Sequence, residues 1–273
     1  MKTVQCNLPD SIYNALQTIA RSERSSVEHV ALSILAQSTG TQVHTLFQVS
    51  TSSALVEGLY QGAVRVGQLL EQGDFGLGTF IDLDGEMVVL DGVCYQVEAN
   101  GNVTLVESDR LIPFAVVTRF AHDFSRHFAS LTGLHSLTEA CNSFRQSNNI
   151  FYAFRIDGRF SSIKTRVMRP VLSGTNLRTA AGGQAEFDLE SQEGTLVGLW
   201  SPGFAGSFSV PGYHFHFLSK DRKVGGHVLD CAVPEAMISG CGLSDMHVAL
   251  PETKEFLEAD FSRNPSEDLR AAE

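Results

Sequence analysis

Three histidines in the last quarter of the chain have a spacing that suits a metal site. His214 and His216 alternate with aromatic residues, so in a β-strand both imidazoles lie on one face and the aromatic rings on the other. A charged segment follows, and then His227. In an antiparallel hairpin whose turn is centred between Asp221 and Arg222, residue 216 lies opposite residue 227, and opposed residues share a face. The pattern therefore predicts three imidazoles on one side of a sheet.

Three imidazoles in this arrangement can hold a divalent metal ion. Zinc accepts histidine nitrogens and keeps a fourth coordination position open in catalytic sites. Cobalt, nickel, iron or manganese could use the same ligands, because imidazole does not choose sharply among these metals. A single histidine in a strand is usually structural, and it is the third histidine, placed by the register, that favours a metal site.

Sequence patterns after residue 44 predict the strands and helices that would position these histidines. Short β-prone segments are separated by Asp-Gly and Asn-Gly turns, and the amphipathic segment 134–144 is typical of a helix. Asp157-Gly158 predicts a turn after a strand at 151–156, and β character resumes at Gly194 after a polar segment.

The expected fold class is α/β, of the α+β type, with two β-rich mixed-sheet domains and flanking helices. The first domain is expected at 43–166. The second, at 167–273, holds the metal site and ends in a C-terminal tail. A small strand–helix–helix module at 1–42 precedes both domains.

The first 42 residues have a different pattern of predicted secondary structure from the rest of the chain. Residues 2–7 alternate like a short strand, and amphipathic helices are predicted after Pro9 and after a capping box that begins at Ser25. This order resembles the ribbon-helix-helix family, which forms intertwined dimers and reads DNA with outward ribbon side chains, here Thr3 and Gln5. One positive charge on the ribbon favours dimerisation or packing over DNA binding. A helical hairpin packed on the main body is the alternative.

The composition of the chain limits the kinds of protein that it can be. With 273 residues, 43% of them hydrophobic, the chain can bury a substantial core. Its formal net charge of −11 argues against a general nucleic-acid surface. The five cysteines form no C-x-x-C pair, which fits a reducing compartment better than a disulfide framework. No secretory signal and no run long enough to span a bilayer is visible, so a cytoplasmic protein without a membrane segment is expected.

Several segments resemble the α-acetolactate decarboxylase family and follow one another in that family's order. They are 47–51 (FQVST), 73–80 (GDFGLGTF), 83–86 (LDGE), 90–92 (LDG), 113–115 (PFA), 155–158 (RIDG), 164–166 (KTR), 210–217 (VPGYHFHF) and 225–227 (GGH). The resemblance covers about residues 45–260 and leaves out the first 40. It implies two α/β domains, a homodimer, and a zinc ion (Zn²⁺) held by His214, His216 and His227. It also implies a carboxy-lyase that converts (S)-2-acetolactate to (R)-acetoin and carbon dioxide.

The resemblance also assigns catalytic residues. The family's active-site threonine, glutamate and arginine fall on Thr79, Glu86 and Arg166. A further family glutamate near the C-terminus is best matched by Glu273, with Glu267 as the second choice.

These residue types suit the loss of carbon dioxide from a β-keto acid. Decarboxylation leaves electron density on the ketone oxygen as an enediolate, and a metal ion with an open position stabilises such charge as a Lewis acid. Arg166 is permanently cationic and can hold the carboxylate or the enediolate oxygen. A glutamate in a partly desolvated pocket can donate the proton, and Glu86 and Glu273 are the candidates.

Other functions stay open at this point. Another metal-dependent lyase or hydrolase could use the same three histidines, as could a cupin-like metal- or sugar-binding module without catalysis. Alternatively, the protein could be a regulator that binds DNA through its N-terminal module. Glu86 and Arg166 favour catalysis, because a storage site needs neither residue. The sequence contains neither the G-x-S-x-G elbow of serine hydrolases nor a phosphate-binding glycine loop.

Overall fold

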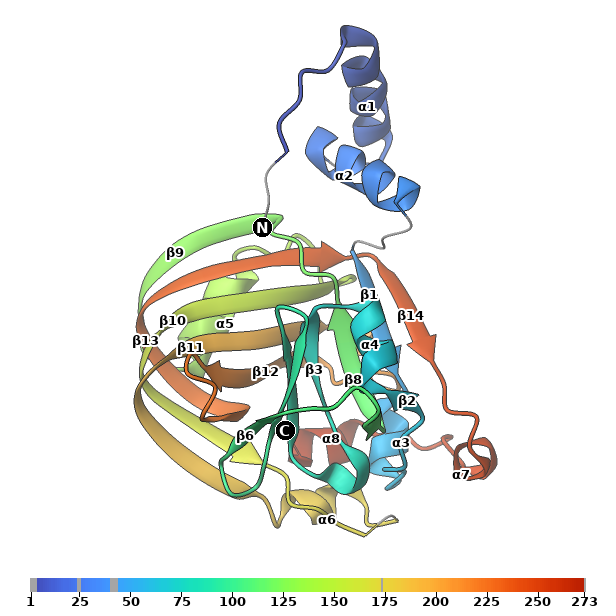
Figure 1. Ribbon diagram of the computed structural model, residues 1–273, viewed down its shortest axis with the longest axis vertical. Helices are drawn as coiled ribbons and strands as arrows, with labels where there is room; N and C mark the ends of the chain where they lie inside the picture. Colours follow the sequence, from blue (N-terminus) through green and yellow to red (C-terminus); the bar gives the residue numbers. More distant parts are fainter. Residues whose placement is uncertain (1–3, 24–25, 40–43, 173, 273) are drawn as a thin grey trace. The chain divides into compact units, whose positions relative to one another are not determined.

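The chain forms two compact units (Figure 1). The computed structural model describes residues 4–23, 26–39, 44–172 and 174–272. Backbone contacts divide the chain into Met1–Val43 and His44–Glu273. Each unit has a buried apolar cluster of its own, small in the first unit and extensive in the second.

The smaller unit consists of two helices, α1 (Asp10–Glu23) and α2 (Val27–Ser38). The hydroxyl of Ser26 accepts the backbone N–H of His29 at 3.1 Å and caps α2, one residue after the predicted cap at Ser25, which lies outside the described residues. Residues 4–9 form neither helix nor strand, so the strand predicted at 2–7 is absent from its described part. A single extended segment has no neighbour with which to pair its backbone groups.

One mixed sheet of seven strands forms half of the larger unit. Its strands are β1 (Thr45–Val49), β3 (Phe75–Thr79), β4 (Glu86–Leu90), β5 (Val93–Val97), β6 (Val103–Leu105), β8 (Phe114–Thr118) and β14 (Asp245–Ala249). The order is β14-β1-β8-β3-β4-β5-β6. β1 and β14 run parallel, and the other pairs are antiparallel. The first and last strands of the unit are therefore neighbours.

The second sheet is antiparallel and strongly curved (Figure 1). Its strands are β9 (Phe124–Leu131), β10 (Phe151–Val167), β11 (Ala185–Ser201), β12 (Gly212–Ser219) and β13 (Gly225–Leu243). The order is β10-β11-β12-β13-β9, and β13 also pairs with β10. β10 is thus hydrogen-bonded on both sides, and β10 to β13 close on themselves.

Apolar clusters arrange these elements in layers. Leu77 and Val88 of the first sheet pack with Val197 of the second in the cluster between the sheets. Helix α5 (Leu134–Asn142) contributes Leu137 to the cluster on the other face of the five-stranded sheet. Helix α4 (Val66–Gln72) contributes Leu69 to the cluster on the outer face of the seven-stranded sheet. Successive side chains of a strand point to opposite faces, so β3, β4 and β8, which are buried at every position, supply apolar side chains to the clusters on both faces of their sheet.

Short elements connect and close the layers. They are α3 (Ser52–Val56), β2 (Val64–Arg65), η1 (Ile81–Leu83), β7 (Leu111–Ile112), α6 (Leu177–Ala181), η2 (Gly203–Ala205), α7 (Lys254–Glu258) and α8 (Ser266–Ala272). This mixed α+β architecture agrees with the fold class expected from the sequence. Among the described residues, no helix has the length and apolar character to cross a membrane.

Two predicted boundaries in the second sheet are wrong. The turn at Asp157-Gly158 does not form, because β10 continues through it with partners on both sides. Asp157 accepts a hydrogen bond from the Thr195 hydroxyl at 2.6 Å, and Gly158 leaves room for the nearby Glu235 carbonyl. β11 begins at Ala185 rather than at Gly194. Its largely polar first half is partly exposed, and it pairs with β10 in the same register as the second half.

The chain crosses between the two sheets more than once. β9 and β10 belong to the five-stranded sheet although they precede residue 167, and β14 belongs to the seven-stranded sheet although it follows that residue. The division into domains at 43–166 and 167–273 stays a prediction.

Phe217 offers a test of how much the second sheet contributes to stability. It is fully buried and contacts Phe160 with ring centroids 5.3 Å apart. We expect Phe217→Ala to lower the free energy of unfolding by about 3–5 kcal/mol, because it leaves a cavity. The measurement is urea unfolding followed by circular dichroism. Phe204→Ala is the matched control, since Phe204 is 71% exposed; equal losses in the two variants would contradict the packing described.

Candidate metal and active site

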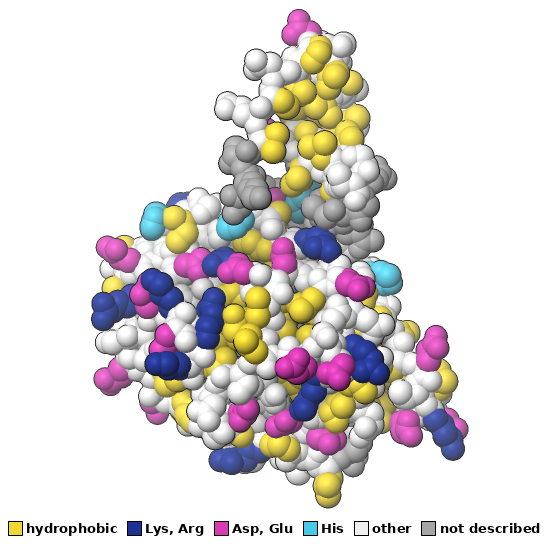
Figure 2. All heavy atoms as spheres, viewed as in Figure 1, with side chains coloured by type: hydrophobic (Ala, Val, Ile, Leu, Met, Phe, Trp, Pro, Cys, Tyr) yellow, Lys and Arg dark blue, Asp and Glu magenta, His cyan; other side chains and the backbone are white. Residues whose placement is uncertain are grey.

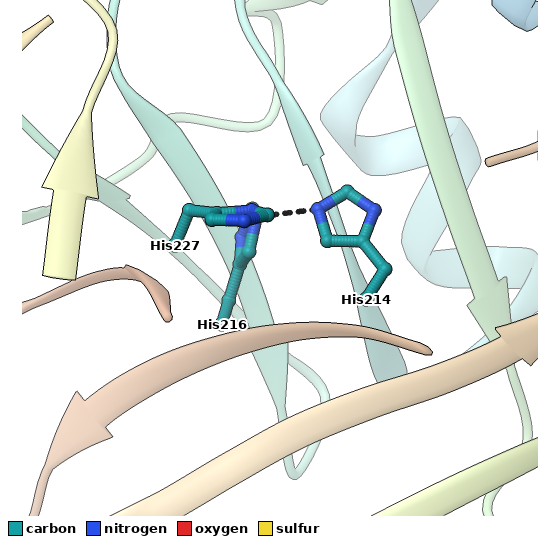
Figure 3. Close-up of side chains that lie close together, drawn as sticks. All are labelled: His214, His216 and His227. Atoms are coloured by element: carbon teal, nitrogen blue, oxygen red, sulfur yellow. Dashed lines mark hydrogen bonds between the residues drawn. The ribbon is translucent and has the colours of Figure 1, made fainter. Parts of the chain in front are cut away.

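The hairpin of β12 and β13 brings the three histidines together (Figure 3). His216 pairs directly with His227, which confirms the predicted register. The Ser219 hydroxyl accepts the backbone N–H groups of Lys223 and Val224 at 3.1 Å and thereby holds the turn. His214 lies two residues before His216, and the three ring centroids are 4.8–5.5 Å apart. The imidazoles therefore converge from two adjacent strands.

Gly226 fixes the position of His227. Its φ is +131°, a conformation that residues with a side chain rarely adopt, and an added Cβ would lie 2.8 Å from the Arg166 carbonyl oxygen. Only glycine lets β13 approach β10 this closely. Arg166 then lies directly opposite His227, so His216, His227 and Arg166 form a row across three strands.

The ring of His216 is oriented by the other sheet. Its Nδ1 lies 2.8 Å from the carbonyl oxygen of Met87 in β4. A carbonyl oxygen only accepts, so Nδ1 carries the proton and Nε2 presents a lone pair. That Nε2 lies 3.1 Å from Nε2 of His214. Two nitrogens bound tetrahedrally to one zinc ion would be about 3.3 Å apart, given the usual Zn–N distance.

Burial keeps these rings in the form that binds metals. It lowers the pKa of His214 to about 3, and the charge of Arg166 adds to the effect. Burial likewise holds the pKa of His216 well below its ordinary value, with His214 and Arg166 contributing. Both imidazoles are therefore neutral near pH 7, and neutral imidazole is the ligand form.

The three histidines fit a divalent transition metal. Their candidate ligand nitrogens all lie within 4.8 Å of one another. A set of three imidazole nitrogens suits such metals, whereas magnesium and calcium prefer oxygen ligands. His216 and His227 are buried and His214 is partly exposed to the cavity beside them.

Glu86 is a buried carboxylate next to these rings. It is 5% exposed and begins β4, where it pairs with Thr79 of β3. One carboxylate oxygen accepts the backbone N–H of Met168 at 3.1 Å, and the other lies 3.5 Å from Nε2 of His216. The side chain is thus held by the residue that follows β10 on one side and directed at the imidazoles on the other.

Thr79 and Arg166 complete the polar lining. The Thr79 hydroxyl donates to the Gly85 carbonyl at 2.8 Å and so steadies the turn that precedes Glu86. Arg166 is 5% exposed and donates from Nη1 to the Gln184 side-chain oxygen at 3.1 Å. A cation, a carboxylate and three imidazoles therefore meet where the two sheets face each other.

Thr79, Glu86, Arg166 and the three histidines all line one cavity. It measures about 510 Å³, its open mouth included, and apolar side chains form the rest of its wall. That wall consists of Leu55, Gly78, Leu83, Phe114, Met168, Leu177, Val210, Leu269 and Ala272. The structure thus brings together six of the seven predicted site residues. The seventh, Glu273, lies outside the described residues, although its neighbour Ala272 lines the cavity; Glu267, the second choice, is exposed.

Sequence reasoning missed the apolar wall and the partner of Arg166. Leu269 and Ala272 come from α8, in a tail whose sequence shows only loose periodicity. Gln184 lies in the segment before Gly194 that the sequence marked only as polar. A helical spacing of three between 269 and 272 is the one signal that pointed to a buried face.

Comparison with known proteins decides the family. The sequence profile of alpha-acetolactate decarboxylase matches residues 46–263. The chain belongs to this family. The alpha-acetolactate decarboxylase of Methanosarcina mazei is 38% identical over 84% of this chain and 80% of its own length. That of Methylococcus capsulatus is 38% identical over 86% and 90%.

A solved structure agrees with the sequence match. The crystal structure of alpha-acetolactate decarboxylase from Bacillus subtilis strain 168 superimposes with a TM-score of 0.81 at 31% identity, covering 84% of this chain and 98% of that one. The family resemblance read from the sequence is therefore confirmed. Helices α1, α2 and α8 fall outside the region that the acetolactate decarboxylase profile matches.

Gly226 allows a test of the site geometry. We expect Gly226→Ala to weaken binding of a divalent metal ion at least about tenfold, because the added methyl group displaces His227 from the other two ligands. Titration calorimetry with Zn²⁺ or Co²⁺ on metal-free protein measures this. Gly203→Ala is the control, since a Cβ there meets no atom within 4 Å. Unchanged affinity in the Gly226 variant would show that His227 is not held through this glycine.

Proposed function

We propose that the protein is a carboxy-lyase that converts (S)-2-acetolactate to (R)-acetoin and carbon dioxide. The observation that carries the proposal is the convergence of three imidazoles with Glu86 and Arg166 in one cavity, in a member of the acetolactate decarboxylase family. A metal-storage site would need neither a buried carboxylate nor a buried guanidinium, both of which cost free energy to bury.

We propose Zn²⁺ as the metal, held by His214, His216 and His227. When bound there, it supplies Lewis-acid stabilisation of negative charge that develops on substrate oxygens. The protein orients the ligands in advance through the bond from His216 to the Met87 carbonyl. Support for zinc comes from the nitrogen ligand set and from the spacing of the two Nε2 atoms.

Arg166 and Glu86 have separate roles in the proposed reaction. Arg166 holds the substrate carboxylate and then the enediolate oxygen, because its guanidinium keeps its charge throughout. When the bond to the carboxylate carbon breaks, its electron pair stays on the substrate as the enediolate and carbon dioxide leaves. Glu86, protonated for this step, delivers a proton to the carbon, and water later returns that proton to the carboxylate. Thr79 positions Glu86 through the Gly85 turn.

Glu273 remains a second candidate for proton delivery. Its support is that α8 places Leu269 and Ala272, its near neighbours in sequence, on the cavity wall. The apolar wall suits the two methyl groups of the substrate.

We also propose a cellular location and an oligomeric state for the enzyme. A cytoplasmic location is supported by five free cysteines, four of them buried, which fit a reducing compartment. A homodimer and a likeness of residues 1–42 to ribbon-helix-helix modules rest on the sequence patterns alone.

Metal removal is the direct test of the metal's role. Protein treated with a chelator and shown to be metal-free is expected to form no acetoin from racemic 2-acetolactate above the spontaneous rate, because the developing charge then lacks its stabilising cation. Adding Zn²⁺ should restore the activity. Acetoin is measured colorimetrically, and circular dichroism checks that the metal-free protein stays folded. Full activity without metal would exclude the proposal.

Glu86→Gln separates catalysis from metal binding. The amide keeps the size of the side chain but cannot deliver the proton, so kcat is expected to fall by about 10²–10⁴. Metal content, measured by mass spectrometry, should stay at one ion per chain. Glu107→Gln makes the same change at an exposed position outside the cavity and serves as the control. A variant with wild-type kcat would remove Glu86 from the mechanism.

A further inference from the structure

Gln184 connects the cavity arginine to the surface of the protein. Nη1 of Arg166 donates to Oε1 of Gln184 at 3.1 Å, and Nε2 of Gln184 donates to the carboxylate of Glu186 at 3.2 Å. Arg166 is buried at the cavity, Gln184 is partly buried and Glu186 is exposed. The amide of Gln184 therefore lies between a buried cation and an acidic group at the surface.

The pairing of β10 with β11 places these groups on one face of the sheet. Arg166 is directly opposite Glu186, and directly opposed residues share a face. Lys164 lies two residues before Arg166 on the same strand, so it shares that face as well. Its Nζ forms an ion pair with Glu186 at 2.8 Å. A continuous row of polar contacts thus runs from the ammonium group of Lys164 to the guanidinium group of Arg166.

The two neighbours of Gln184 fix the orientation of its amide. A guanidinium group can only donate hydrogen bonds, and an ionised carboxylate can only accept them. Hydrogen bonds from Lys164 and Gln184 hold the pKa of Glu186 below its ordinary value, so this carboxylate is ionised near pH 7. The amide therefore satisfies both neighbours only with its oxygen toward Arg166 and its nitrogen toward Glu186.

Gln184 accepts from Arg166 without placing a negative charge beside it. Arg155 shows the other way to hold an arginine, since it forms ion pairs with the carboxylates of Asp91 and Asp157. A carboxylate that is paired with a guanidinium group reduces the attraction of that group for a further anion. An amide fixes the position of the guanidinium group and does not neutralise its charge.

The charge of the whole protein makes the neutrality of this amide important. The formal net charge is −11, which disfavours the approach of an anionic substrate. Figure 2 shows acidic and basic side chains interspersed on the face of the larger unit that is in view, so that face offers no broad basic area in compensation. Attraction of a carboxylate then depends on the cation inside the cavity.

We propose that Gln184 is a positioning residue, which holds the guanidinium group of Arg166 at the cavity and leaves it fully charged for the carboxylate of the substrate. Glu186 acts one step further out, by fixing the amide of Gln184. This role rests on the proposed function, in which Arg166 binds the substrate carboxylate. Loss of Gln184 should therefore weaken the binding of carboxylates and leave uncharged ligands unaffected.

Gln184→Met tests this role in the full-length protein loaded with Zn²⁺. Methionine has nearly the same length but lacks the amide, so the guanidinium group of Arg166 loses this acceptor. Titration calorimetry gives the Kd of 2-hydroxyisobutyrate, an anionic hydroxy acid without a ketone, and the Kd of acetoin, which is uncharged. We expect the Kd of the hydroxy acid to rise about tenfold and that of acetoin to change less than about twofold. A purely structural role would weaken both ligands alike.

Gln192→Met is the matched control. Gln192 lies on β11, is also partly buried, and its amide donates to the carbonyl oxygen of Glu190. It does not line the cavity, so the same change there should leave both dissociation constants at their wild-type values. Circular dichroism and the metal content of each variant report whether it remains folded and loaded.

Exchanging the two side chains separates geometry from charge. In the double variant Gln184→Glu with Glu186→Gln, position 184 still accepts from Arg166, position 186 donates to position 184, and Lys164 keeps an oxygen acceptor. The negative charge then lies next to Arg166. The variant keeps every contact and so covers the case in which Gln184→Met unfolds. We expect it to bind 2-hydroxyisobutyrate at least about tenfold more weakly than the wild type does, with the Kd of acetoin unchanged.

Four outcomes would overturn the proposed role of Gln184. One is an absence of binding of 2-hydroxyisobutyrate by the wild type, and another is an unchanged Kd of this ligand in Gln184→Met. The third is an equal weakening of acetoin and the hydroxy acid. The fourth is wild-type affinity for the hydroxy acid in the exchanged variant. Charge-selective binding by a protein that forms no acetoin from 2-acetolactate would instead count against the proposed function alone.

Discussion

The pairing of His216 with His227 is the contact on which the site depends. Side chains alternate along a strand, so a slip of one residue would turn one of these rings to the opposite face. The same register places Arg166 opposite His227 on the neighbouring strand. Gly226 makes this spacing possible because the backbone of β10 occupies the space that a side chain would need. The register of one hairpin thus sets the positions of His216, His227 and Arg166 and requires glycine at position 226.

Bonds between the sheets hold the polar groups in the cavity. His216 donates to the Met87 carbonyl across the interface, and the Met168 backbone donates to Glu86 in the reverse direction. Elsewhere Arg155 of β10 forms an ion pair at 2.6 Å with Asp91, which follows β4, and this pair joins the two sheets. Asp157 of the same strand also binds Arg155, at 2.8 Å. Buried polar groups are costly unless they are paired, so these bonds allow a reactive cluster inside an apolar core.

The hairpin and its three histidines could be predicted from the sequence because the turn is local and the period of a strand is two. The start of α1 near Pro9 and the helix α5 followed from equally local signals. Asp157-Gly158 was misread, because strands far away in sequence override a turn signal. Glu86 and Arg166 depended on family resemblance, since their roles come from the meeting of two sheets. The spacing of residues 269 and 272 indicates an apolar helix face, but that this face lines the cavity follows from where α8 packs.

The parallel pair of β1 and β14 has a consequence for how the protein is made. Thr45 pairs with Asp245, so the first strand of the larger unit waits for one that is synthesised two hundred residues later. Contacts so distant in sequence are slow to form, because a long loop must close before they contribute. Until then one edge of β1 stays open on the nascent chain, where it can pair with strands of other molecules. Completion of the seven-stranded sheet therefore waits until β14 has been synthesised, and before that point the open edge of β1 can lead to aggregation.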